Sequence, residues 1–190
     1  AAHVTMLSRI PVDPVLFSPR ERRAVLDGLV EIMRDARRGN FTITHDDQDV
    51  HLAVERRLTE RLGDLGRRIH TGRSRNDQVA VDLRLHAREH LLALQEEVAD
   101  LSLAMLAFAR RHRKLPMVGR THLQPAMPSS VGLWASGHAE GFLDDLPLLS
   151  AAYEYADRCP LGSAAGYGVP LPLDRDLTSR LLGFAVPHHN

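Results

Sequence analysis

A stretch of 37 residues without glycine or proline, from Asp77 to Arg113, constrains the fold more than any other feature of this chain. Glycine and proline are the residues that most often interrupt helices, and an unbroken helix of this length is about 55 Å long. Apolar residues recur along it at spacings of three and four, in what we call the apolar seam: Leu91, Leu94, Val98, Leu101, Met105 and Phe108. This pattern predicts a long helix that packs against other long helices.

The apolar surface of this predicted helix is wider than one partner covers, because further apolar residues flank the seam: Leu92, Leu103, Leu106 and Ala109. The sequence predicts one other helix of roughly similar length, from about Ser129 to Arg158. Pro147 is expected to kink this helix. We therefore expect the remaining cover to come from other subunits or from residues outside this sequence. The abrupt beginning and end indicate a fragment of a longer protein.

Shorter helices are predicted elsewhere in the chain. A capping box at Ser18–Glu21 begins one that Gly39 ends. A second runs from about Asp49 to Gly63, and a short one begins near Asp174. Only Phe41–Thr44 alternates as a strand does, and weakly. The prediction is an all-α protein, with a small helical N-terminal domain at 1–73, incomplete at its start, and a long-helix bundle domain at 74–190, truncated at its end.

Composition limits the partners and the compartment. The 24 basic and 24 acidic residues balance, so no overall charge favours nucleic acid or an anionic membrane as a partner. The single cysteine, Cys159, excludes an internal disulfide framework and fits a reducing environment. No segment has the length and hydropathy of a signal peptide or membrane span. We expect a soluble, cytoplasmic protein.

The densest group of polar side chains lies in His70-Thr71-Gly72-Arg73-Ser74-Arg75-Asn76-Asp77-Gln78. Two guanidinium groups, a hydroxyl and a carboxamide precede the long helix, whose first N–H groups also favour anions. This segment predicts a site for a small molecule that carries carboxylates. The alternative is a well-capped helix start with two solvated arginines.

A second candidate segment is Gly119–Pro128, a proline-bounded loop between the two long helices. His122 is its natural group for proton transfer, because the ordinary pKa of histidine lies near neutrality. The alternative is a histidine whose hydrogen bonds hold the loop together.

Other motifs are weaker. His86 and His90 match a zinc-peptidase pattern, but no third acidic ligand follows at a suitable position. The glycines near Gly166 lack the third glycine and the preceding strand of a dinucleotide-binding loop. We predict neither a metal nor a cofactor.

Taken in order, four segments resemble the argininosuccinate lyase branch of the fumarase/aspartase superfamily. The segment from His70 to Gln78 matches the most diagnostic signature of that branch without a gap. Asp49-Val50-His51, followed by Glu55, is similar to its acidic segment, although Gln48 replaces one usual acid. The remaining matches are Thr121–Ala126, after which Met127 replaces a usual glutamine, and the glycine-rich 160–166 with its continuation 172–175.

The resemblance implies a homotetramer with shared active sites and no cofactor. The implied reaction is the reversible elimination of argininosuccinate to arginine and fumarate, the last step of arginine biosynthesis. Ser74, Arg75 and Asn76 would hold the carboxylates, Thr121 would bind substrate, and His122 would belong to the acid–base pair. His51 is expected nearby in a supporting role.

Parts of the family pattern lie outside this sequence. The second acid–base residue of the family is a serine on a loop that would follow Asn190, so the resemblance implies that the fragment alone is inactive. Two alternatives stay open: another lyase of the superfamily, such as adenylosuccinate lyase or aspartase, and a helical assembly protein that keeps the scaffold without the chemistry.

Overall fold

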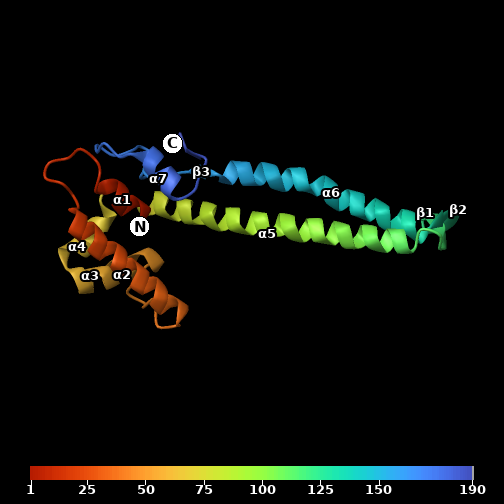
Figure 1. Ribbon diagram of the computed structural model, residues 1–190, viewed down its shortest axis with the longest axis horizontal. Helices are drawn as coiled ribbons and strands as arrows, with labels where there is room; N and C mark the ends of the chain where they lie inside the picture. The colour runs from red at the N-terminus through yellow and green to blue at the C-terminus, as the bar shows by residue number, and fades with distance from the viewer. Residues whose placement is uncertain (190) are drawn as a thin grey trace. The chain divides into compact units, whose positions relative to one another are not determined.

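The computed structural model describes residues 1–189, and the fold is helical (Figure 1). The elements in chain order are α1 (Ala2–Leu7), α2 (Pro19–Arg37), α3 (Val50–Leu62), α4 (Asp64–Arg67), the 3-10 helix η1 (Arg68–His70), α5 (Arg75–Arg111), β1 (Pro116–Thr121), β2 (Gln124–Ser130), α6 (Val131–Ala156), β3 (Arg158–Cys159), α7 (Arg175–Leu181) and β4 (Val186–Pro187). The prediction of an all-α class is confirmed, and the two small sheets, each of two strands, add local structure to it.

The chain forms two compact units. The first comprises residues 1–82 together with the segment that begins at Arg158, and the second comprises Leu83–Asp157. The division at residue 74 stays a prediction about the complete fold.

The core of the first unit gathers residues from α1, α2, α3 and η1 and from the loop between α1 and α2. Its buried members are Val4, Met6, Leu7, Ile10, Phe17, Val25, Leu58 and Ile69. At the start of α2, Ser18 Oγ accepts from the Glu21 N–H at 3.3 Å, and Glu21 Oε2 accepts from the Ser18 N–H at 2.8 Å. These two bonds confirm the predicted capping box, and the Ser18 N–H lowers the pKa of Glu21.

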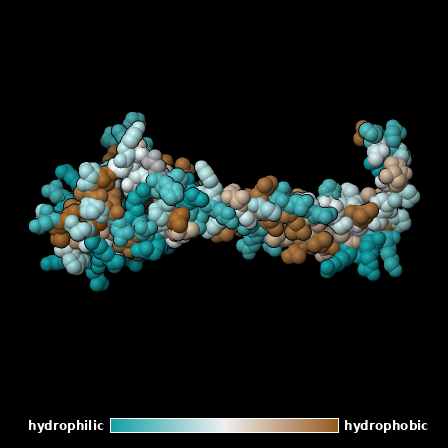
Figure 2. Space-filling view, turned by 90° about the horizontal axis from the view of Figure 1, so that it is seen from above, coloured by the Kyte–Doolittle hydropathy of each residue, from teal (hydrophilic) through white to brown (hydrophobic). Residues whose placement is uncertain are grey.

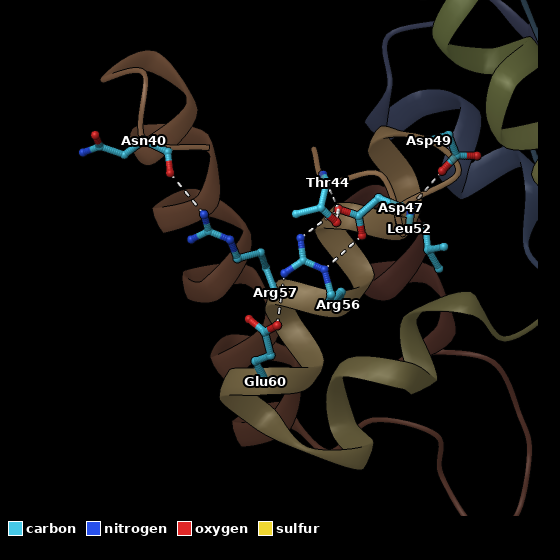
Figure 3. A network of polar contacts seen from close by, with 8 residues as sticks. All are labelled: Asn40, Thr44, Asp47, Asp49, Leu52, Arg56, Arg57 and Glu60. Carbon is cyan, nitrogen blue, oxygen red and sulfur yellow. Dashed lines mark hydrogen bonds and ion pairs between the residues drawn. The ribbon is translucent and has the colours of Figure 1, made fainter. Parts of the chain in front are cut away.

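A polar network fixes the start of α3 (Figure 3). The buried Asp47 carboxylate accepts two hydrogen bonds from Arg56, at 2.9 and 2.8 Å, and one from the Thr44 N–H at 2.9 Å. Hydrogen bonds from Arg56 and Thr44 hold the pKa of Asp47 well below its usual range. Asp49 caps α3 through the Leu52 N–H at 2.8 Å. The loop before α3 is therefore held in place by two carboxylates.

The second unit is a pair of long helices joined by a hairpin (Figure 1). α6 contacts α5 near both of its ends. Arg84 donates to the Tyr155 carbonyl at 2.7 Å, and Arg88 pairs with Asp157 at 3.2 Å. At the other end, a Cβ on Gly132 would lie 2.6 Å from the Arg113 Cα, so only glycine fits there.

The hairpin β1–β2 replaces the loop predicted between the long helices. The two strands pair antiparallel from Pro116–Ser130 to Thr121–Gln124, with an irregularity between Val118 and Arg120. The weak strand signal at Phe41–Thr44 was wrong, since those residues have no regular structure. The predicted long helices, by contrast, are α5 and α6, and Pro147 lies inside α6.

Apolar side chains lie exposed along the second unit, where Figure 2 shows brown surface over the long helices. The large apolar side chains of α5 and α6 that are exposed within this unit are Leu83, Leu92, Leu94, Leu101, Leu103, Phe108, Leu133, Trp134, Leu143, Leu148 and Tyr155. Even so, among residues 1–189 no helix combines the length and the apolar character that crossing a membrane requires.

Candidate active site

The first cluster of predicted site residues lies where α5 begins. Ser74 Oγ accepts from the backbone N–H of Asn76 at 3.3 Å and from its Nδ2 at 3.2 Å. Arg75 Nε pairs with Asp49 at 2.9 Å, and its Nη1 donates to Gln78 at 2.5 Å. The hydroxyl, the carboxamide and the guanidinium predicted to bind carboxylates are thus brought together. The contact with Asp49 joins them to the start of α3.

Asp77 holds this cluster in place through hydrogen bonds to the backbone. Asp77 is 3% exposed, and its carboxylate accepts hydrogen bonds from three backbone N–H groups: Ser74 at 3.0 Å, Gly162 at 3.0 Å and Ala164 at 2.9 Å. The bonds within 74–77 are those of a capped helix start, so this alternative describes the local structure correctly. Capping and binding are compatible, because the Ser74 hydroxyl keeps its own hydrogen to donate.

The glycine-rich segment is held on its other side by Arg175. Arg175 Nη2 donates to Ser163 Oγ at 2.9 Å and to the His188 carbonyl at 2.7 Å. Gly162 has a φ of 98°, and a Cβ there would also lie 3.0 Å from the Arg175 side chain. The loop therefore packs between Asp77 and Arg175, while Tyr167 at its tip is 96% exposed.

Two histidine–carboxylate pairs lie next to the cluster. His51 Nε2 is 3.0 Å from Asp82 Oδ2, and His70 Nδ1 is 3.5 Å from Glu55 Oε2. Burial raises the pKa of Asp82, while the charges of His51 and Arg73 oppose that rise. His51 thus lies within the first unit, and its imidazole pairs with the Asp82 carboxylate.

His3 holds the turn that leads into the cluster. His3 is 3% exposed, and its Nε2 lies 2.7 Å from the Thr71 carbonyl oxygen, so Nε2–H donates to that oxygen. Burial, and then the charge of Arg73, lower the pKa of His3 to about 3. The imidazole is therefore neutral at physiological pH.

Thr121 and His122 lie elsewhere, at the tip of the β1–β2 hairpin in the second unit. Both side chains are exposed, and the turn residues His122 and Leu123 have φ values of 48° and 63°. The first unit therefore holds Ser74, Arg75 and Asn76, and the second holds Thr121 and His122. Neither unit contains the whole predicted set.

The histidine pair on α5 shows no metal-binding arrangement. The rings of His86 and His90 lie 4.1 Å apart. Across residues 1–189, no group of three or more His, Cys, Asp or Glu side chains is placed to hold a metal ion.

Sequence reasoning found the cluster but not all the residues that build it. The Ser74-x-x-Asp77 spacing is that of a capping box and predicts the first of the three bonds to Asp77. The bonds from Gly162 and Ala164 join positions more than 80 residues apart, and no local pattern indicates them. His3 was likewise missed, because a lone histidine in an apolar helix carries no signal of its contact.

Taken together, these features define an all-α protein with a hydroxyl, a carboxamide and a guanidinium gathered at one helix start and an exposed histidine in a hairpin. A lyase family model matches residues 5–186, and the chain belongs to that family. The resemblance predicted from the four segments is thereby confirmed.

Relatives in sequence include argininosuccinate lyases. The one from Phocaeicola vulgatus is 47% identical over 189 residues, which are 100% of this chain and 42% of that protein. The one from Sorangium cellulosum is 48% identical over 184 residues, 97% of this chain and again 42% of the relative. The chain thus spans less than half the length of the curated relatives it matches.

Solved structures agree in fold. EDDS lyase in complex with formate is 31% identical with a TM-score of 0.86 over 100% of this chain, which covers 36% of that chain. The fumarate lyase:delta crystallin of Brucella melitensis, in a structure bound to cobalt, is 18% identical with a TM-score of 0.79 over 100% of this chain and 45% of that one. At that identity the second likeness concerns the fold alone.

Proposed function

We propose that the protein to which these residues belong is an argininosuccinate lyase that splits argininosuccinate into arginine and fumarate, the last step of arginine biosynthesis. The observation that carries the proposal is the cluster of Ser74, Arg75 and Asn76, which Asp77 holds at the start of α5. The argininosuccinate lyases at 47% and 48% identity support the choice of substrate. A variant of the related EDDS lyase has been solved with bound fumarate, which supports fumarate as a product.

The proposed chemistry needs an acid, a base and donors to a developing carbanion. A base removes the proton from the carbon beside a carboxylate, and an acid protonates the departing guanidinium nitrogen. Ser74, Arg75 and Asn76 hold the carboxylate on which the negative charge develops, since donors already in place stabilise such an intermediate. Thr121 binds substrate, and His122 is one of the two acid–base residues. No step requires a cofactor or a metal.

Assembly completes the site in this proposal. Neither unit of the chain holds all five side chains, and the long helices carry exposed apolar residues. A homotetramer in which each subunit supplies one motif accounts for both observations. The substrate and products are small molecules, and we propose a cytoplasmic location.

The test is the substitution His122→Asn in the complete protein that contains this chain. Asn is similar in size and hydrogen bonds but does not titrate near neutrality, so kcat is expected to fall about 10²–10⁴-fold with the assembly intact. His86→Ala and His90→Ala are the controls on the histidine pair of α5. Full activity in His122→Asn, with activity lost in either control, would overturn the assignment.

A substrate panel separates the alternatives. Fumarate release from argininosuccinate is expected, and none from adenylosuccinate or aspartate. Release from either of these would favour another lyase of the superfamily. No release from any of them by the complete protein would favour an assembly protein without activity. We further expect the 190 residues alone to show no lyase activity, because one acid–base residue of the family pattern lies outside them.

A further inference from the structure

One end of the second unit carries a concentration of positive charge, which we call the basic tip. It comprises the last turn of α5, the turn that follows and the end of β1. Its cationic residues are Arg110, Arg111, Arg113, Lys114 and Arg120. The whole chain balances at 24 basic and 24 acidic residues, and the other arginines of this unit are Arg84 and Arg88. Positive charge is therefore gathered at one end of the long helices.

Within the second unit, no acidic residue lies close to the basic tip. Residues 101–139 contain no Asp or Glu, and the acids that flank this stretch are Asp100 and Glu140. Asp100 lies about 15 Å before Arg110 along α5, at 1.5 Å per residue. Glu140 lies about 12 Å along α6 from Gly132, the position where α6 packs against the end of α5. Both distances exceed the Debye length of about 8 Å at physiological ionic strength, so these acids neutralise little of the charge.

The five cationic side chains of the basic tip are exposed, and among residues 1–189 none of them forms an ion pair. Arg88 of the same unit, by contrast, pairs with Asp157 at 3.2 Å. Cations are favourable at the carboxyl end of a helix, which accounts for Arg110 and Arg111 in the last turn of α5. That effect falls off within one turn, so it does not account for Arg120, which lies on β1.

The same end of the unit carries the histidine proposed for acid–base chemistry. His122 is exposed at the turn of the hairpin, two positions after Arg120. The hairpin and the end of α5 lie together at one end of the paired helices (Figure 1), and hydrophilic surface projects there (Figure 2). Clustered charge of one sign raises the local concentration of ions of opposite sign and the rate at which they arrive. An anion that approaches His122 therefore enters an attractive field.

We propose that the basic tip draws small organic anions to the hairpin and so speeds the arrival of a dicarboxylate such as fumarate at His122. The attraction of small anions follows from the charges alone. Only the identification of the anion with a substrate of the lyase rests on the proposed function. Because the cations act at a distance, they change the rate of arrival and leave the chemical step to other residues.

The first experiment measures the reverse reaction of the complete protein, in which fumarate is an anion and arginine a cation. The tip variant Arg110→Gln/Arg111→Gln/Lys114→Gln removes three charges. At an ionic strength of about 0.01 M, where the Debye length is about 30 Å, kcat/KM for fumarate should fall about 3–10-fold with kcat unchanged. At about 1 M, where that length is about 3 Å, the variant and the unchanged protein should agree. For arginine, kcat/KM should not fall, an outcome that misfolding does not produce.

The matched control is Arg34→Gln/Arg37→Gln/Arg38→Gln, which removes three exposed cations from the end of α2 in the first unit and should leave the fumarate kinetics nearly unchanged.

The second experiment needs no turnover. Trp134 is the single tryptophan of the 190 residues, is 49% exposed and lies two positions after Gly132, which packs on Arg113. Iodide, an anion, should quench its fluorescence more strongly than caesium, a cation, once both are compared with neutral acrylamide. The tip variant should lower the iodide quenching constant about 2-fold and leave that of acrylamide unchanged. Trp134→Phe identifies the signal in the complete protein.

Iodide quenching that is the same in the tip variant and the unchanged protein would overturn the inference, and so would unchanged fumarate kinetics or an equal fall in kcat/KM for arginine. A Trp134 that none of the three quenchers reaches would overturn it too, because a covered tip cannot attract ions. If the tip variant instead lost binding of a single-stranded oligonucleotide while fumarate kinetics stayed unchanged, the tip would be a nucleic-acid site. A protein without lyase activity whose iodide quenching falls in the variant keeps the attraction of small anions and loses the lyase proposal.

Discussion

At the scale of the residue, one carboxylate joins two segments that lie 85 positions apart. Asp77 accepts the Ser74 N–H from its own helix start and the Gly162 and Ala164 N–H groups from the glycine-rich loop. A buried carboxylate is tolerated when such donors surround it. The cluster and the loop are therefore placed by the same side chain.

Asp77→Asn should loosen both segments. Asn offers one acceptor oxygen and brings an NH₂ group toward N–H donors, so at least one backbone N–H loses its partner at a cost of about 1–3 kcal/mol. The free energy of unfolding, measured in urea, should fall. The rate of chymotrypsin cleavage at Tyr167 should rise. Asp64→Asn, at a side chain 87% exposed, is the control. An unchanged cleavage rate would contradict this role of Asp77.

His3 makes stability depend on pH. Its pKa is about 3 in the folded protein against 6.5 ordinarily, because burial and Arg73 disfavour the charged ring. Between those values the unfolded chain holds a proton that the folded chain does not, so stability rises with pH and is lost as pH falls from 6.5 toward 3.

His3→Gln should make the loss of stability below pH 6.5 shallower, by up to about 1.4 kcal/mol per pH unit. Gln keeps a donor for the Thr71 carbonyl but does not titrate, so stability at pH 7 should change less than stability at pH 5. Urea unfolding at a series of pH values measures this. The control is His45→Gln, at an exposed histidine. Parallel pH curves for the unchanged protein and His3→Gln would count against a buried neutral ring.

At the scale of the element, close approaches between helices depend on two glycines that contact Leu58 of α3. A Cβ on Gly66 of α4 would lie 2.5 Å from the Leu58 carbonyl carbon and from the Thr59 nitrogen, both backbone atoms. A Cβ on Gly28 of α2 would meet only the end of the Leu58 side chain, at 2.8 Å.

Gly66→Ala should therefore destabilise more than Gly28→Ala. Backbone cannot move aside as a leucine methyl does, so we expect a loss of about 1–3 kcal/mol for Gly66→Ala. For Gly28→Ala, the gain in helix propensity stabilises the fold by about 1 kcal/mol and offsets the cost of moving the Leu58 side chain. The measurement is the melting temperature of each variant, which should be lower for Gly66→Ala. Equal melting temperatures would contradict the packing described for α3 and α4.

The elements themselves were largely predictable, because their signals are local. Ser18, Asp49 and Asp174 cap the helices they were predicted to begin. The β1–β2 hairpin was not predictable. Its two-residue turn has positive φ at His122 and Leu123, where glycine or asparagine is the usual signal, and its strands contain Pro116, Pro125 and Pro128.

At the scale of the whole molecule, local signals predict the site only in part. The segment around Ser74 and the residue His122 were found because each carries recognisable side chains at short spacing. The rest of the cluster at the start of α5 is built by contacts between distant segments, as with Asp77 and the glycine-rich loop, and such contacts leave no local pattern.

The second unit should drive association of the chain with copies of itself. Leu94 and Leu101 of the apolar seam are 42% and 45% exposed, and Leu133 and Leu148 of α6 are 67% and 70% exposed. Large exposed apolar surface is rarely left in water by a monomer. Light scattering at micromolar concentration should show an oligomer. The double substitution Leu94→Glu/Leu101→Glu should shift it to monomer, because charges in the seam oppose its burial.

Val15→Glu is the matched control, since Val15 is a 63% exposed apolar residue of the first unit, and the oligomer should persist in it. Circular dichroism shows whether each variant stays helical. An unchanged protein that is monomeric and fully helical at micromolar concentration would refute assembly through the seam. An oligomer that survives Leu94→Glu/Leu101→Glu but dissociates in Val15→Glu would instead place the interface on the first unit, and the proposal of sites shared through the long helices would fall with it.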